Sequence, residues 1–291
     1  MFKVGDIVAR KSYGNDILFK VVEIKKSGKE NMVTLKGINY RIEADAPESD
    51  LALQSDRYIS ENNERFCRAI EKKCQEAIAS RETGKLKKLF TRDTAKDGSR
   101  DFSRPGKVLH IDGDNDYLDA CLEKYKSFGI EAVGKYIAEK EQPGSIYKLL
   151  QENRPDILVL TGHDGLIKGD NNINDINSYR NSKYYISAVK EARRYESDLD
   201  SLTIFAGACQ SMYNEIIKAG ANFASAPYRV LIHALDPVFI CQKIAFASID
   251  KILTPLDVIS GTITGYKGIG GIQTRGKYRN GYPSEPSSLQ P

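Results

Sequence analysis

The sequence predicts an α/β fold with a mostly parallel sheet, helices on both of its faces, and a small β module in front of it. From residue 107 onward, short apolar runs alternate with stretches of helical periodicity. Alternation at this spacing is typical of parallel strands joined by covering helices. The first 55 residues instead hold several strand-length runs separated by turn sequences. At 291 residues and 41% hydrophobic composition, the chain is large enough to bury a core in each part.

The N-terminal module, residues 1–55, is expected to be an SH3-like β-barrel. Its β-rich runs cover residues 4–10, 18–24, 31–35 and 40–44, and Gly and Asn turns separate them. Several short strands within about fifty residues are typical of small barrels.

Residues 56–106 are predicted to form a helix and a mobile linker. Apolar residues recur at helical spacing over residues 56–91, whereas residues 92–106 are charged and contain Gly and Pro. Arg92, Arg100 and Arg104 in this linker are candidate self-cleavage points.

The α/β domain is predicted to span residues 107–273, followed by a disordered tail over residues 274–291. We expect strands at residues 107–112, 131–137, 156–160, 202–206 and 223–226, and residues 230–235 are expected to continue the last of them. Helices are expected at residues 117–128, 142–152, 177–195, 212–219 and 237–249.

Composition excludes several classes of protein. The formal net charge is only +4, which does not favour nucleic acid as a partner. No apolar run reaches the length of a membrane span, and the first ten residues lack a signal-peptide core. The five cysteines are odd in number and show no metal-binding C-x-x-C spacing, so we expect reduced thiols in a reducing compartment. The lack of a signal-peptide core predicts a protein made in the cytoplasm, and the chemistry predicted below requires no metal or organic cofactor.

Two matched segments carry the predicted chemistry. One apolar run leads to His163 and another leads to Cys209, each surrounded by small residues. Functional groups of open α/β sheets collect at the carboxyl ends of parallel strands. We therefore expect a Cys209–His163 dyad. A helix opening directly after Cys209 would lower the pKa of its thiol, and the backbone N–H groups of Cys209 and Gly165 would bind the oxyanion.

The remaining histidines and cysteines are predicted to be structural. His110 lies mid-strand and His233 lies in an apolar run, although His233 is the reserve candidate for the base. Cys121 and Cys241 fall on apolar helix faces.

The run Gly207-Ala208-Cys209-Gln210-Ser211, with His163 upstream, resembles the caspase-like clan that includes legumain, clostripain and gingipain. Asp164 departs from that pattern, because it stands between His163 and Gly165. The resemblance implies a caspase-like sheet and a thiol protease.

A longer resemblance, to the YabG peptidase family, covers nearly the whole chain. It is carried by residues 5–13, 160–165, 206–211, 222–227 and 233–238. The resemblance implies a cysteine endopeptidase that cleaves after Arg and processes spore coat and germination proteins during sporulation. It also implies synthesis in the mother-cell compartment, or association with the spore coat.

Selectivity for Arg requires a buried carboxylate, because a guanidinium pairs with a carboxylate through two hydrogen bonds. Asp112 is the favoured pocket residue, Asp114 follows it, and Asp164 and Asp236 are further candidates. Ser225 is expected to line the pocket wall, and Asp116 to cap the following helix.

Two other functions remain open at this point. Asp112-Gly113-Asp114, with Thr161, also resembles the nucleophile loop of Mg-dependent haloacid-dehalogenase-type phosphatases, although only Asp198 and Asp200 offer a further acidic pair. Alternatively, the chain is a non-enzymatic adaptor whose basic and aromatic N-terminal module binds nucleic acid or a peptide.

Overall fold

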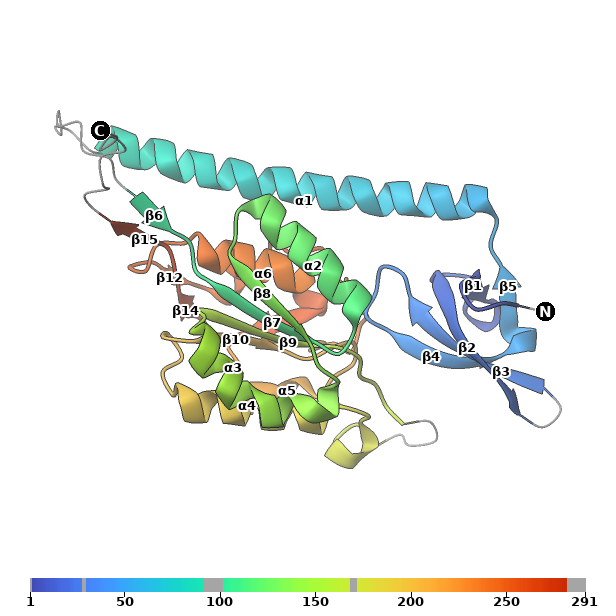
Figure 1. Ribbon diagram of the computed structural model, residues 1–291. Coiled ribbons are helices and arrows are strands. Elements are labelled where there is room, and N and C mark those ends of the chain that lie inside the picture. The colour runs from blue at the N-terminus through green and yellow to red at the C-terminus, as the bar shows by residue number, and fades with distance from the viewer. Residues whose placement is uncertain (1, 28–29, 92–101, 168–171, 282–291) are drawn as a thin grey trace, which may run out of the picture.

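The computed structural model describes residues 2–27, 30–91, 102–167 and 172–281, and it confirms the predicted α/β architecture (Figure 1). Within these ranges no helix combines the length and the apolar character needed to cross a bilayer.

The central sheet has six strands in the order β13-β11-β10-β9-β7-β8. Neighbouring strands from β8 to β11 run parallel, and β13 pairs antiparallel with β11. The strands are β7 (Val108–Asp112), β8 (Ala132–Tyr136), β9 (Ile157–Thr161), β10 (Thr203–Ala206), β11 (Phe223–Ser225) and β13 (Ile269–Gly271).

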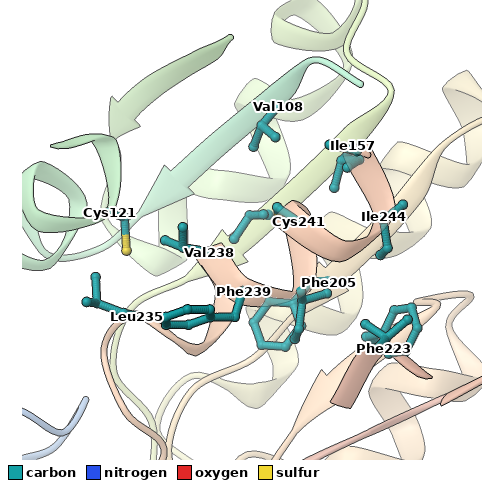
Figure 2. Packing of buried hydrophobic residues seen from close by; sticks show 14 of the residues in the cluster. Val108, Cys121, Ile157, Phe205, Phe223, Leu235, Val238, Phe239, Cys241 and Ile244 are labelled. Atoms are coloured by element: carbon teal, nitrogen blue, oxygen red, sulfur yellow. The ribbon is translucent and has the colours of Figure 1, made fainter. Parts of the chain in front are cut away.

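Helices cover both faces of this sheet (Figure 1). One face carries α2 (Asn115–Phe128), α6 (Asp236–Ala245) and α7 (Pro255–Ile259), and the other carries α3 (Gln142–Asn153), α4 (Ser182–Tyr195) and α5 (Tyr213–Lys218). Successive strand residues alternate between the two faces. Val108 therefore packs under α6, whereas Leu109 packs under α3 and α4. Figure 2 shows Val238, Phe239 and Ile244 of α6 against the sheet.

The N-terminal module is a five-stranded antiparallel sheet in the order β4-β3-β2-β1-β5. Its strands are β1 (Ile7–Arg10), β2 (Phe19–Ser27), β3 (Glu30–Gly37), β4 (Glu43–Pro47) and β5 (Leu51–Leu53). The sequence analysis missed β5, which is only three residues long and pairs with β1. The segment predicted as a strand at residues 40–44 is a strand only from Glu43.

The long helix α1 (Asp56–Thr91) confirms the helix predicted over those residues. It runs from the N-terminal sheet across the α/β domain (Figure 1). Ile70, Cys74 and Ala77 pack against the core under α6, and Lys73 Nζ donates to the Ser260 carbonyl at 3.0 Å.

Three predicted segments differ from the structure. Residues 230–235 do not continue the sheet, because His233 forms an isolated bridge with Tyr40 of the N-terminal module instead. The tail predicted as disordered contains β14 (Thr274–Arg275) and β15 (Arg279–Gly281). The linker predicted as mobile contains β6 (Phe102–Arg104), which pairs with β15. Residues 92–101 of the linker, with Arg92 and Arg100, and residues 282–291 lie outside the described residues.

Two short strands complete the fold. β12 (Ile252–Leu253) pairs with β14, so the beginning of the predicted tail is fixed against the α/β domain. Strands of two or three residues carry little periodicity of their own, and their partners lie far away in the sequence.

Candidate active site

His163 and Cys209 follow neighbouring parallel strands at the same edge of the sheet. Ala206 of β10 is in register with Leu160 of β9, and the Gly207 N–H continues the ladder by donating to the Leu160 carbonyl at 3.0 Å. The turns that carry the imidazole and the thiol are thus adjacent.

Asp164 ties the two turns together. Its Oδ2 accepts hydrogen bonds from Ser211 Oγ at 2.9 Å and from Ser182 Oγ at 2.5 Å, while its Oδ1 accepts from the N–H groups of Gly165 and Asn181 at 2.8 Å. These four donors occupy the carboxylate, so Asp164 braces the edge of the sheet. One of the donors is the Gly165 N–H, which was predicted to bind the oxyanion.

His163 is held by a carboxylate that the sequence analysis missed. The His163 N–H donates to Glu139 Oε1 at 2.7 Å, and the same oxygen lies 3.9 Å from the ring Nδ1. Gly113 and Gly162 make room for Glu139, because a Cβ at either position would overlap its carboxylate. Two glycines beside strand ends were the signal in the sequence for this close approach.

The opposite ring nitrogen of His163 is buried and makes no hydrogen bond with any described residue. It lies 3.5 Å from Asp114 Oδ2, and the imidazole lies 5.7 Å from the ring of Tyr117, centroid to centroid. This nitrogen is therefore available for proton transfer, with a carboxylate nearby to stabilise an imidazolium.

The Cys209 thiol is 1% exposed and accepts a hydrogen bond from the Ile232 N–H at 3.2 Å. Burial raises the pKa of Cys209 to about 12, so the thiol is protonated at neutral pH in this conformation. The predicted lowering by a helix N-terminus is wrong here, because α5 begins only at Tyr213, four positions after the cysteine.

Asp112 contacts a guanidinium of the same chain. Arg41 Nη1 lies 2.6 Å from Asp112 Oδ2, and both side chains are fully buried. Thr161 Oγ1 and the Asp114 N–H also donate to Asp112. Burial acts to raise the pKa of Asp112, but the charge of Arg41 and the hydrogen bonds and charge interactions of Arg41 and His110 together hold the pKa well below its usual range. Arg41 was not identified from the sequence.

Asp114 takes the helix-cap role that was predicted for Asp116. Asp114 is the N-cap of α2, accepting from the Tyr117 N–H at 3.1 Å, whereas Asp116 lies inside the first turn. Lys36 of β3 lies 2.7 Å from Asp114 and 2.6 Å from Asp116. Asp114 therefore faces His163 and Lys36 together.

Ser225 and Asp236 support backbone. Ser225 Oγ donates to the Ala208 carbonyl at 2.8 Å, beneath the cysteine turn. Asp236 accepts from the N–H groups of His233, Ile263 and Thr264 and from the Thr264 hydroxyl. Burial raises the pKa of Asp236, and no cation among the described residues pairs with it.

The other histidines and cysteines lie where packing was expected. His110 is fully buried between Tyr125 and Thr161. His233 is 2% exposed, its Nδ1 accepts from the Leu235 N–H at 3.0 Å, and burial lowers its pKa to about 4. Cys121 and Cys241 are fully buried. In the described part of the chain, no three His, Cys, Asp or Glu side chains cluster as a metal site would require.

Comparison with known proteins gives two matches. Residues 3–283 match the family described as YabG peptidase U57. The chain is 42% identical over 287 residues to the sporulation-specific protease YabG of Bacillus subtilis (strain 168), covering 97% of this chain and 98% of that protein.

Proposed function

The chain belongs to the YabG peptidase family, and from this premise we propose that it is a cysteine endopeptidase that cleaves protein substrates after arginine during sporulation. The observation that carries the proposal is the shared edge: the turns of His163 and Cys209 follow register-paired strands and are linked through Asp164 and Ser211.

The proposed reaction is a two-step acyl transfer. His163 Nε2 takes the proton of the Cys209 thiol, and the thiolate attacks the carbonyl carbon of the scissile bond. The C–N bond breaks, the imidazolium returns its proton to the leaving amine, and a thioester remains. Water, deprotonated by His163, then hydrolyses the thioester and regenerates the thiol. This chemistry uses no metal or organic cofactor.

Glu139 and Asp114 act on His163 during this cycle. Glu139 fixes the backbone of the histidine turn, and both carboxylates stabilise the imidazolium that forms when the thiol loses its proton. The Cys209 N–H is the proposed oxyanion donor. A contribution from the Gly165 N–H requires that it leave Asp164 when substrate binds.

Asp112 is the proposed carboxylate at the bottom of the pocket for the arginine side chain. Its contact with Arg41 at 2.6 Å supports this role, since the site already accommodates a guanidinium. Asp236 is a weaker candidate, because backbone N–H groups and a hydroxyl occupy its oxygens. A phosphatase is disfavoured by the peptidase family to which the chain belongs.

The proposed substrates are spore coat and germination proteins, reached from the mother-cell compartment or at the spore coat. The B. subtilis relative is described as a sporulation-specific protease, and the similarity extends over almost the full length of both chains. The N-terminal sheet is proposed as part of the same enzyme, since its residues reach Asp112 and Asp114. This contact disfavours an independent adaptor module.

The test is hydrolysis of an Arg-containing peptide by the parent protein and by Cys209→Ala and His163→Ala. Each substitution should lower kcat/KM by at least about a thousandfold, because nucleophile and base act as a unit. Ser187→Ala, which loses one hydrogen bond on the exposed side of α4, is the matched control. Undiminished hydrolysis by a folded Cys209→Ala protein would refute the proposed chemistry.

A further inference from the structure

A segment of the N-terminal module, residues 39–41, lies along the candidate active site and is called the docked segment below. It connects β3 to β4 and contacts the loop at residues 232–234 of the α/β domain. The partners are 193 positions apart in sequence, so the contact arises from the tertiary fold alone.

The backbone of the docked segment pairs as an added antiparallel strand. The Arg41 N–H donates to the Ile232 carbonyl at 3.2 Å, the Ala234 N–H donates to the Asn39 carbonyl at 3.0 Å, and Tyr40 bridges to His233. Peptide ligands commonly bind by adding a strand in this way, with main-chain bonds for affinity and side-chain pockets for specificity.

The side chain of Arg41 fills the pocket at Asp112. Besides its ion pair with Asp112, its Nε and Nη2 donate to the Ala234 carbonyl at 3.3 and 3.1 Å. The guanidinium is fully buried. A buried charge with this many partners is strongly held, since removing one partner leaves the other uncompensated.

The docked segment is also adjacent to the nucleophile. The Ile232 N–H binds the Cys209 thiol while the Ile232 carbonyl binds the Arg41 N–H, so one residue links the two. The arginine backbone and the sulfur therefore bind the two ends of the same residue.

Further contacts fasten the docked segment and its flanks. The Tyr117 hydroxyl donates to the Tyr40 carbonyl at 2.7 Å and also to the Gly37 carbonyl. Lys36 pairs with Asp114, and the ring of Tyr40 packs on Phe66 and His233. After Arg41 the chain turns back at once, because the Gly37 N–H donates to the Ile42 carbonyl at 2.8 Å.

We propose that residues 232–234 and Asp112 form the binding site for an extended, arginine-bearing peptide, and that the docked segment is an internal ligand that occupies this site. The inference rests on the proposed function. A substrate peptide must displace residues 39–41 before its own arginine reaches Asp112 and its carbonyl reaches Cys209. The apparent affinity for substrate is then reduced by the fraction of molecules in which the site is open.

The experiment follows carbamidomethylation of Cys209 by iodoacetamide at neutral pH, detected by mass spectrometry of the tryptic peptide. This readout needs no catalysis, so it separates failure of this inference from failure of the proposed function. The rate is proportional to the fraction of open molecules, and Arg41→Ala should raise it at least about tenfold. Arg10→Ala is the matched control, since Arg10 pairs with Asp50 inside the N-terminal sheet.

A second arm of the alkylation experiment occupies the site at Asp112 that Arg41→Ala leaves empty. Millimolar N-ethylguanidinium should slow the alkylation of Arg41→Ala and leave the parent rate unchanged. If Arg41→Ala fails to fold, Tyr117→Phe keeps the test, because it removes only the hydroxyl that fastens the docked segment, and it should also accelerate alkylation. Parent-like rates in a folded Arg41→Ala protein, or in Tyr117→Phe where that variant carries the test, would overturn the proposal.

Discussion

Two fully buried aspartates near the active edge have opposite surroundings. Asp112 faces the charge of Arg41, and its pKa is held below the usual range although burial acts to raise it. Asp236 faces backbone N–H groups and a hydroxyl, and burial raises its pKa. The comparison teaches that burial alone does not identify a pocket carboxylate. The cation that neutralises Asp112 identifies it as a guanidinium site, whereas the donors around Asp236 identify it as a brace for two loops.

The largest expected effect is on selectivity. Between matched peptides with arginine or its neutral isostere citrulline, the parent should favour arginine by about a hundredfold or more in kcat/KM, because a buried carboxylate left unpaired is costly. Asp112→Asn should abolish most of this preference, and Asp236→Asn should keep it. Loss of the preference in Asp236→Asn alone would move the pocket to the other aspartate.

The second effect is on stability at acid pH. The folded-state pKa of Asp112 is lowered, so its contribution to the free energy of unfolding is present above its unfolded pKa of about 3.9 and is lost as pH falls further. Asp236 has a raised pKa, so its ionisation opposes folding as pH rises through the folded value. Urea unfolding at pH 4 and pH 2 measures this change. Between these two pH values the free energy of unfolding should fall less in Asp112→Asn than in the parent, and an equal fall in both proteins would contradict the ion pair.

A smaller effect is expected at Glu139. Glu139→Gln keeps an acceptor for the His163 N–H but removes the negative charge near the ring. We expect kcat to fall by about tenfold or less, because the imidazolium that forms during the reaction is less stabilised. Glu141→Gln, two residues further along the chain and exposed, is the control. An unchanged kcat in a folded Glu139→Gln protein would contradict a role of this carboxylate in stabilising the charged ring.

The smallest effect is expected at the link between the two turns. Ser211→Ala removes the hydrogen bonds to Asp164 Oδ2 and to the Ala208 N–H, so it should lower the free energy of unfolding by about 1–3 kcal/mol. Thermal unfolding monitored by circular dichroism measures this change, with the exposed Ser187→Ala as the control. Equal stability of the two variants would show that the link contributes nothing measurable.

The sheet and its active edge were predictable because their signals are local. Apolar runs such as residues 157–160 differ from their polar flanks, and parallel strands direct their carboxyl ends to one edge. The positions of His163, Cys209 and Asp112 at that edge follow from this rule alone.

The contacts made around that edge were not predictable from local pattern. Arg41 reaches Asp112 only because the N-terminal sheet docks on the α/β domain, and the same docking turns residues 230–235 into a loop that pairs with Tyr40. The shift in the pKa of the Cys209 thiol was predicted in the wrong direction. The sequence indicates a helix after Cys209, but it does not show the burial of the thiol, which dominates its pKa. The cap of α2 was misplaced by two residues, from Asp114 to Asp116.

The most direct measurement is labelling with a peptidyl-arginine chloromethyl ketone, followed by mass spectrometry of the adduct. We predict a single adduct on Cys209 in the parent, its absence in Cys209→Ala, a strong decrease in His163→Ala and Asp112→Asn, and no adduct from the peptidyl-leucine analogue. An adduct on another residue, or equal labelling by the arginine and leucine reagents, would contradict a cysteine peptidase that reads arginine through Asp112.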